Sequence, residues 1–315
     1  MPRSCSTGEG CWSQPVQPDC AGIGQSATGA IGRCDSPARR AGIPGSLAPD
    51  GTSGTQSRAS TLLMPEAFYD ELASCYHLLY GDWERAIAGQ GAALDALLRE
   101  CDVRSGEDVL DAACGIGTQT LGLVQYGYRV TASDISSGAV ERLRLELARR
   151  GVHADSRVDD IRTLRLAATG SFSAVLACDN AIVHLLSDDE ILEAFRSCFR
   201  CLRPGGVAVC SVRDYAAMER RNPDVRPYGL SRDAGRRFLA VQVWEWEGDQ
   251  YDLRMYLTSE SEGGTCETRV LRSRLYAVTI ARLVELLREA GFADIQRRDD
   301  VLFQPILLGR RTHVP

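Results

Sequence analysis

The sequence predicts an α/β fold in which helices cover a parallel sheet. Two observations predict it. From residue 108 to residue 212, short apolar runs of strand length alternate with longer patterns of helical spacing. The first of these strands, 108–111, also runs directly into a glycine-containing turn and then into a helix. This order of elements is typical of strand–helix–strand units, in which neighbouring strands pair in parallel.

The patterned part of the chain begins at Met64, and its elements follow in order. Apolar residues at helical spacing, such as Ile87, Leu94 and Leu98, support the helices. The helix that ends near residue 150 is followed by Gly151, a residue suited to a helix C-terminus. We predict helices over 65–80, 84–100, 118–126, 138–150 and 188–202, and strands over 108–111, 129–133, 172–178 and 207–212.

Residues 236–277 show a different pattern. Apolar and polar residues alternate in two runs, with a turn signal at Gly248-Asp249 between them. This alternation predicts antiparallel strands, and we place them in an insertion at about 214–277. The elements that complete the chain are an amphipathic helix from Ile280 to Gly291 and strands near 293–298 and 301–308.

The first 63 residues differ in composition from the rest. Gly, Pro and Ser supply 25 of the first 60 residues, and large apolar residues occur singly. Such a segment cannot bury enough apolar surface to offset the entropy lost on ordering. We therefore predict a disordered arm over 1–63 that takes no part in the activity, and a folded domain over 64–315. The arm lacks the apolar stretch of a secretory signal, and a transit peptide or a true start at Met64 are the alternatives.

Composition and charge argue against several classes of protein. The chain has 36 basic and 42 acidic residues, a net charge of −6, which argues against a nucleic-acid-binding surface. No apolar run approaches the roughly 18 residues of a membrane span. The 12 cysteines form no disulfide or zinc pattern, since Cys198 and Cys201 lack a second pair. We therefore expect a cytoplasmic protein with reduced thiols, no metal, and neither nucleic acid nor membrane as a partner.

The strongest functional signal is a glycine turn after the first strand. Asp111 ends that strand, and Gly115 and Gly117 follow in the turn. Glycines at such a turn let the backbone approach a ligand closely, since no Cβ intervenes. Asp134 ends the next strand, 17 residues beyond Gly117, where an acid of a doubly wound fold hydrogen-bonds ribose hydroxyls. The sequence therefore predicts an adenosine-type ligand.

Two residues distinguish between adenosine ligands. A dinucleotide fingerprint has a third Gly or Ala, and this chain has Thr120 at that position. The carboxylate of Asp111 would repel a pyrophosphate but suits a cation. S-adenosylmethionine has no phosphate and carries an ammonium and a sulfonium. We therefore predict S-adenosylmethionine as the cofactor, and a nicotinamide dinucleotide is disfavoured.

Residues 109–118 resemble motif I of the class I S-adenosylmethionine-dependent methyltransferases, and residues 158–161 resemble their adenine-contact segment. Residues 202–206 are similar to the turn before their fifth strand. The resemblance spans about 64–310 and implies a Rossmann-like sheet of seven strands, mostly parallel, with the last strand antiparallel. It implies ribose contact by Asp134 and adenine contact by Asp160 and Ile161. The cofactor-binding residues that we expect on this basis are Asp111, Ala113, Gly115, Gly117, Asp134, Ile135, Asp160, Ile161, Cys178 and Arg85.

A narrower resemblance is to the glycine and sarcosine N-methyltransferases. It rests on residues 80–85, 179–185 and 212–215. In that family the matching Asn contacts the acceptor amine and the matching Arg holds its carboxylate, which implies these roles for Asn180 and Arg213. Arg85 sits one residue away from the family's cofactor-carboxylate Arg. Asp179 stands where the family has Gly, an added acid that bears on the charge of the acceptor.

We therefore expect a methyltransferase that acts on a small molecule, at the nitrogen of a glycine-like amine or amino acid that can carry a carboxylate. The predicted catalytic residues are Asn180, Arg213, His184 and Tyr228. His184 is a candidate base or a structural histidine, and the structural alternatives for the first two are a turn residue and an ion pair with Asp214. Methyl transfer from a sulfonium needs alignment above all, so no triad is required.

Other interpretations stay open at this point. Tyr69, Tyr76 and Tyr80 share a helical face, which either covers the site or packs the core. One alternative function is O-methylation of a secondary metabolite, with His184 or Asp179 as the base. Another is a catalytically silent module that binds an adenosine ligand. The sequence decides neither the oligomeric state nor the number of methyl groups transferred.

Overall fold

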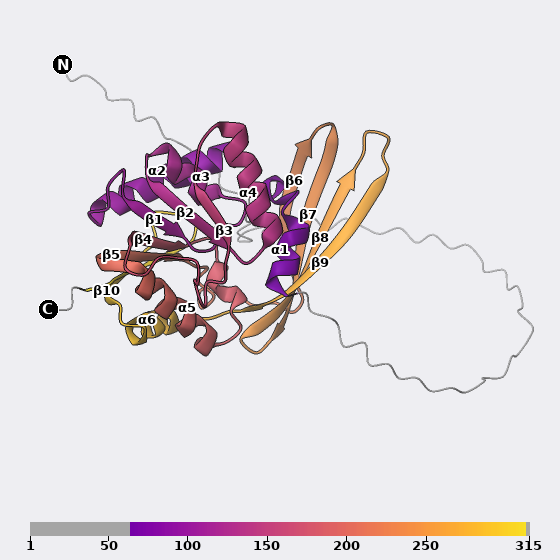
Figure 1. Cartoon of the computed structure of the whole chain (residues 1–315). Coiled ribbons are helices and arrows are strands. Elements are labelled where there is room, and N and C mark those ends of the chain that lie inside the picture. Colours follow the sequence, from indigo (N-terminus) through magenta and orange to yellow (C-terminus); the bar gives the residue numbers. More distant parts are fainter. Residues whose placement is uncertain (1–63, 313–315) are drawn as a thin grey trace, which may run out of the picture. The chain divides into compact units, whose positions relative to one another are not determined.

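A seven-stranded sheet forms the centre of the described chain (Figure 1), which in this computed structural model comprises residues 64–312. The strand order is β10-β11-β5-β4-β1-β2-β3, and β11 runs antiparallel to both of its neighbours. The predicted fold class is therefore confirmed, whereas the predicted arm at 1–63 lies outside the described residues. The strands are β1 (Asp108–Asp111), β2 (Arg129–Asp134), β3 (Asp155–Val158), β4 (Phe172–Ala177), β5 (Leu202–Ser211), β10 (Ala293–Arg298) and β11 (Ile306–Arg310).

Helices cover both faces of this sheet because its central strands are apolar on both sides. In β1, Val109 packs into one core with α2, α3 and α4, and Leu110 packs into a second core with α5 and α6. The helices are α2 (Trp83–Glu100), α3 (Thr118–Gln125), α4 (Ser137–Arg150), α5 (Asp188–Cys201) and α6 (Ile280–Glu289). Ser136, Ser187 and Thr279 each accept a backbone N–H at the start of the helix that follows, which fixes where α4, α5 and α6 begin.

Helices α2 and α3 touch backbone to backbone. A Cβ atom built on Gly91 of α2 would lie 2.7 Å from the Cα of Gly122 in α3, so neither position has room for a side chain. This close approach sets the position of α3, whose N-terminus faces the functional site described below.

A second, four-stranded antiparallel sheet has the order β6-β7-β8-β9. It confirms the antiparallel strands predicted over 236–277, and it begins earlier, at Asp224. The first strand was not predicted because Pro227 and a bulge before Gly229 hide its alternation. These strands are β6 (Asp224–Asp233), β7 (Arg236–Glu247), β8 (Gln250–Glu260) and β9 (Cys266–Tyr276). The inner face of this sheet buries Trp244, Tyr251, Leu253 and Met255 in the same core as α5 and α6.

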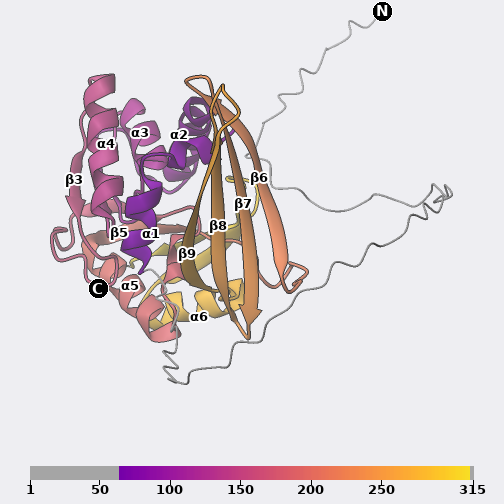
Figure 2. The ribbon, with the colours of Figure 1, turned by 90° about the vertical axis from the view of Figure 1, so that its right-hand side faces the viewer.

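The helix predicted over 65–80 is in fact two shorter pieces, α1 (Pro65–Leu72) and the 3-10 turn η1 (Tyr76–Leu79). Helix α1 lies between α4 and β9 in both Figure 1 and Figure 2. It is attached to the N-terminus of α4 by Asp70, whose Oδ1 accepts hydrogen bonds from Ser136 Oγ at 2.6 Å and Gly138 N at 2.7 Å. A carboxylate at a helix N-terminus is also favoured by the helix dipole.

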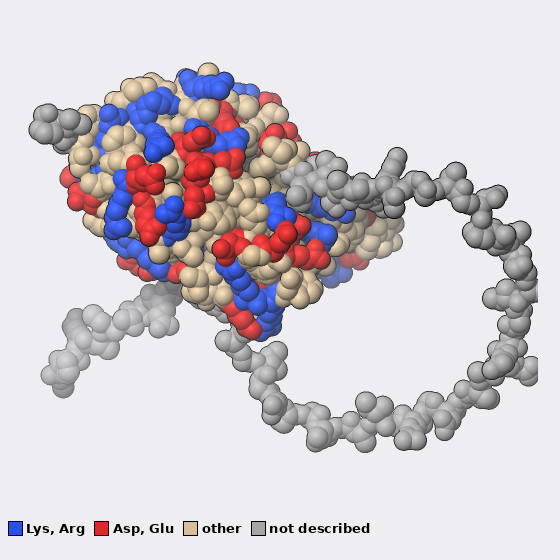
Figure 3. Space-filling view, turned by 90° about the horizontal axis from the view of Figure 1, so that it is seen from below, with Lys and Arg blue, Asp and Glu red and all other residues tan. Residues whose placement is uncertain are grey.

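Surface charge is mixed on the face seen in Figure 3, where acidic and basic side chains are interspersed. Within residues 64–312, no helix is both long enough and apolar enough to span a bilayer. The same residues contain no cluster of three or more His, Cys, Asp or Glu side chains that could hold a metal ion.

Candidate active site

The candidate site lies where the strand order reverses. Strand β1 pairs with β2 on one side and with β4 on the other, and ligands of such sheets bind at the carboxyl ends of the strands at this point. A cavity of about 330 Å³ lies there. The loop after β1 bends sharply because Gly117 has φ 95°, in the left-handed region, as the N-cap of α3.

Seven of the predicted cofactor-binding residues line this cavity, which we call the donor cavity. They are Ala113, Gly115, Asp134, Ile135, Asp160, Ile161 and Cys178. Asp134 is held in place at the end of β2, since its Oδ2 accepts from Gly115 N at 2.8 Å and its Oδ1 accepts from Ser136 N at 2.9 Å. Burial nevertheless raises the pKa of this carboxyl. Each oxygen retains a second lone pair with which it can accept from a ligand hydroxyl.

Three predicted cofactor residues are absent from the lining of the donor cavity. Arg85 is exposed on the first turn of α2, and Gly117 shapes the turn without bordering the space. Asp111 is fully buried beneath the loop, where its Oδ2 accepts from Thr120 Oγ1 at 2.7 Å. Burial raises the pKa of Asp111 to about 7. Any influence of this carboxyl on a bound cation therefore acts through space and not by contact.

Asp160, which the family resemblance assigns to the adenine, is paired with an arginine. Asp160 lines the donor cavity, and its carboxylate accepts hydrogen bonds from Arg162 Nε at 2.9 Å and Nη2 at 2.7 Å. The Arg162 guanidinium also pairs with Glu190 of α5 at 2.7 Å. Burial opposes ionisation of Asp160, but the Arg162 contacts outweigh it and lower the pKa of this carboxyl.

All four predicted catalytic residues line a second cavity of about 120 Å³, which we call the acceptor cavity. These residues are Asn180, His184, Arg213 and Tyr228. Asn180 follows β4 in the left-handed conformation, with φ 67°. Its Oδ1 accepts from Arg213 N at 3.0 Å and its Nδ2 donates to Tyr215 Oη at 2.8 Å. Asn180 thus joins the ends of β4 and β5 and fixes the backbone of Arg213.

Arg213 has no acidic partner among the described residues. Its guanidinium lies over the Trp244 ring of β7, with 4.9 Å between the guanidinium carbon and the ring centroid. Asp214, the partner considered from the sequence, instead pairs with Arg297 at 2.9 Å. The guanidinium is also hydrogen-bonded to Tyr228. Stacking on a buried aromatic ring orients a guanidinium, and its remaining N–H groups can bind an anion.

Five residues line both cavities and therefore form the boundary between them: Tyr69, Tyr76, Tyr80, Asp179 and His184. The tyrosines are those that the sequence places on one face, although α1 and η1 are separate. Successive ring centroids lie 5.9 and 6.1 Å apart. Burial raises the pKa of all three phenols, so the rings stay neutral. Aromatic faces of this kind attract a methylsulfonium.

His184 is a neutral imidazole at this boundary. Its Nε2 lies 2.8 Å from Tyr69 Oη, and burial lowers the pKa of the imidazole to about 4. Asp179 is held on one side only, because its Oδ2 accepts from Gln119 Nε2 at 2.9 Å and from Tyr80 Oη at 3.3 Å. The sequence singled out Asp179 as a departure from a family pattern and as an alternative base for O-methylation. Nothing in its local pattern shows that it reaches both cavities.

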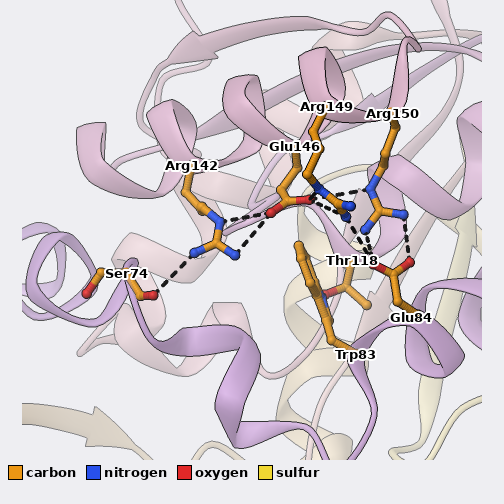
Figure 4. A network of polar contacts seen from close by, with 8 residues as sticks. All are labelled: Ser74, Trp83, Glu84, Thr118, Arg142, Glu146, Arg149 and Arg150. Atoms are coloured by element: carbon orange, nitrogen blue, oxygen red, sulfur yellow. Dashed lines mark hydrogen bonds and ion pairs between the residues drawn. The ribbon is translucent and has the colours of Figure 1, made fainter. Parts of the chain in front are cut away.

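A network around Trp83 braces the donor side of the site (Figure 4). Trp83 Nε1 donates to Thr118 Oγ1 at 2.9 Å, and Thr118 in turn donates to Tyr80 Oη at 3.2 Å. Guanidinium groups of Arg142 and Arg150 from α4 lie 5.7 and 5.6 Å from the Trp83 ring centroid. Arg142 also donates to the Ser74 carbonyl between α1 and η1 at 3.2 Å, which ties the boundary tyrosines to α4.

Comparison with known proteins identifies the family of this chain. Residues 109–206 match a protein family described as a methyltransferase domain. The cypemycin N-terminal methyltransferase of a Streptomyces species is 30% identical over 226 residues, 71% of this chain and 86% of that protein. The chain belongs to the S-adenosylmethionine-dependent methyltransferases. The methyltransferase is also 25% identical over 214 residues to a glycine/sarcosine N-methyltransferase of Parasynechococcus marenigrum, which covers 68% of this chain and 72% of that one.

Solved structures share the fold of this methyltransferase. The S-adenosylmethionine-bound amino pentose methyltransferase CalS10 of Micromonospora echinaspora has a TM-score of 0.62 at 18% identity, covering 72% of this chain and 92% of that one. The sugar N-methyltransferase KedS8 of a Streptoalloteichus species has a TM-score of 0.61 at 18% identity, covering 85% and 100%.

The charges and free hydrogen-bond acceptors around the donor cavity fit S-adenosylmethionine. The buried Asp111 lies next to it, and the Oδ1 of this carboxyl has no hydrogen-bond partner among the described residues. Asp134 adds a second carboxyl group. Such a surplus of acceptors suits a ligand with positive charge and hydroxyl groups, and it opposes a diphosphate.

Proposed function

We propose that this methyltransferase transfers the methyl group to the nitrogen of a small amine or amino acid that carries a carboxylate. The observation that carries the proposal is Arg213, a partly buried guanidinium in the acceptor cavity with no acidic partner among the described residues. A guanidinium so placed suits a bidentate carboxylate.

The size of the acceptor cavity supports a small acceptor. A protein cavity of about 150 Å³ holds benzene, so the 120 Å³ here is suited to on the order of five or six non-hydrogen atoms. Glycine and sarcosine fall in this range. The names of two relatives, an N-terminal methyltransferase and a glycine/sarcosine N-methyltransferase, also refer to amine acceptors.

The mechanism follows from positioning. When bound, S-adenosylmethionine supplies a methyl group already activated by its sulfonium. Asp134 would hold the ribose hydroxyls, and Asp160 and Ile161 the adenine. The boundary tyrosines would exclude water around the transferring methyl, and Arg213 would hold the acceptor so that its nitrogen faces the donor cavity. Alignment of this kind supplies up to about 7–11 kcal/mol of barrier lowering.

The competing functions make different demands on the site. O-methylation of a neutral hydroxyl needs a base, and of the two candidates His184 is a weak one because burial lowers the pKa of its imidazole to about 4. Asp179 also lines the acceptor cavity, but a neutral acceptor would leave the guanidinium of Arg213 in the same cavity without a counter-charge. A silent binding module needs no second cavity with an anion-binding residue. The cytoplasmic location expected from the sequence stays a prediction.

A screen for methylated products tests the proposal. The purified protein is incubated with S-adenosylmethionine and, separately, with glycine, sarcosine, dimethylglycine, L-alanine and a set of phenols, and products are read by mass spectrometry. We expect a mass gain of one or more methyl groups on amines that carry a carboxylate. Methylation of phenols alone would refute the proposal.

A further inference from the structure

Asp179 has one carboxylate oxygen without a role. Its Oδ2 is held by Tyr80 and Gln119 at the boundary of the two cavities, whereas its Oδ1 is buried with no hydrogen-bond partner. The backbone fixes this arrangement, since Asp179 N donates to Ser211 Oγ at 2.7 Å and the residue has φ 55°. An ordered carboxylate oxygen that lacks a donor is a costly arrangement unless a ligand completes it.

The groups that face Asp179 offer it no counter-charge. Tyr80 and Gln119 are neutral donors, Ser211 is neutral, and Asp111 of β1 adds negative charge. No Arg or His within residues 64–312 forms an ion pair with Asp179. Burial raises the pKa of this carboxyl. The missing partner is therefore a cation or a proton-bearing group that arrives with a ligand.

The acceptor cavity contains the opposite, equally uncompensated charge. Arg213 lies in the same cavity of about 120 Å³ and likewise has no ion-pair partner among the described residues. One free anion and one free cation in so small a space match a zwitterion, with its ammonium toward Asp179 and its carboxylate toward Arg213.

Building on the proposed function, we infer that Asp179 Oδ1 binds the ammonium group of the acceptor and takes its proton before methyl transfer. The carboxylate removes one proton from R–NH₃⁺ to give R–NH₂ and a neutral carboxyl. The amine lone pair forms the new N–C bond, and the methyl carbon–sulfur bond breaks with its electron pair going to sulfur. The product R–NH₂⁺–CH₃ and the Asp179 proton then leave to solvent, which restores the carboxylate.

His184 is less suited to this step, although it also lies at the boundary. Its Nε2 is engaged by Tyr69 Oη, and an imidazole with a pKa near 4 holds a proton poorly. The resemblance to glycine and sarcosine N-methyltransferases does not supply the role either, because a glycine stands at this position there. Asp179 would thus give this chain an acceptor preference that differs from that of the glycine and sarcosine N-methyltransferases.

The test compares Asp179→Asn with a matched control, Asp102→Asn. Asp102 also has a left-handed backbone, φ 65°, but its side chain is 86% exposed and lines neither cavity. With glycine and sarcosine as acceptors, we expect kcat/KM of Asp179→Asn to fall about 10²-fold at pH 7. The deficit should shrink roughly tenfold per pH unit toward the pKa of the amine, since only amine already deprotonated in solution then reacts. The control should match the wild type.

Binding of S-adenosylhomocysteine, measured by calorimetry, gives a readout independent of turnover. We expect its Kd in Asp179→Asn to stay within about twofold of the wild type, and a tenfold loss would instead assign Asp179 to the cofactor and overturn the inference. A pH profile parallel to that of the wild type would also overturn it, while leaving the proposed function intact. No amine product from the wild type would refute both. If Asp179→Asn folds poorly, Asp179→Gly replaces it, because glycine readily adopts the φ of 55° at this position. Added formate should then restore the activity of Asp179→Gly. A folded Asp179→Gly variant that formate does not rescue contradicts the inference.

Discussion

Replacement of Asp134 by Ala should separate two roles of one carboxylate. In the ligand-free protein Asp134 accepts hydrogen bonds from Gly115 N at 2.8 Å and Ser136 N at 2.9 Å. Each bond to a charged acceptor contributes about 1.5–3 kcal/mol, and solvent compensates part of the loss at this partly buried site. We therefore expect Asp134→Ala to lower the free energy of unfolding by about 3 kcal/mol. At roughly 2–4 °C per kcal/mol for a domain of this size, Tm should fall by about 6–12 °C.

The affinity for the cofactor should fall as well, and for a different reason. Loss of the acceptor for the ribose hydroxyls should raise the Kd of S-adenosylhomocysteine at least tenfold, which corresponds to about 1.4 kcal/mol. Calorimetry at a temperature well below the Tm of the variant measures this directly.

A nearby acid provides the matched control. Asp159 accepts from the backbone N–H groups of Asp160, Arg165 and Leu166 but does not line the donor cavity. Asp159→Ala should therefore lower Tm without changing the Kd. If Asp134→Ala binds S-adenosylhomocysteine within twofold of the wild type, or if Asp159→Ala weakens binding equally, the ribose assignment is wrong.

Three further perturbations test other parts of the site. Arg213→Met should raise KM about 10²-fold for acceptors with a carboxylate and leave the Kd of S-adenosylhomocysteine unchanged; an equal effect on neutral acceptors would refute the clamp. Gly91→Ala should lower the free energy of unfolding by about 2–3 kcal/mol in denaturant titrations, because its Cβ would meet Gly122 Cα at 2.7 Å, and unchanged stability would contradict the close packing. The pKa of His184 is lowered to about 4, so the unfolded chain takes up a proton first as pH falls below about 6.5 and the folded state loses stability. Relative to His184→Asn, the wild type should thus lose about 2 kcal/mol between pH 7 and pH 5; a constant difference would show that the imidazole is not buried neutral.

Most of the donor side could be predicted because its signal lies in residues that are close together in the sequence. The strand over 108–111, its turn at Gly117 and the acid at Asp134 each follow from a local pattern, and the parallel order of strands brings them together. Asn180 and Arg213 follow strands β4 and β5, which are also adjacent in the sheet. Their presence in one cavity is a consequence of this pairing.

The acceptor side was less predictable because its contacts join distant segments. Residues 73–75 contain neither Gly nor Pro, so nothing local marks the end of α1. Gln242 and Gln304 line the acceptor cavity from β7 and from the loop before β11, and neither belongs to a motif. The stack of Arg213 on Trp244 likewise depends on how the second sheet packs, which periodicity alone does not specify.

Some residues line both cavities and others line only one, and this difference affects how the enzyme can change over evolutionary time. Boundary residues such as Tyr69 serve both cavities, so a mutation there alters both halves of the reaction at once. Gln242, Leu253 and Met255, on strands β7 and β8, border the acceptor cavity alone, whereas Ser273 and Arg274 of β9 line the donor cavity. Drift at these three positions can therefore give descendants of this chain new acceptors while the methyl-donating half stays as it is.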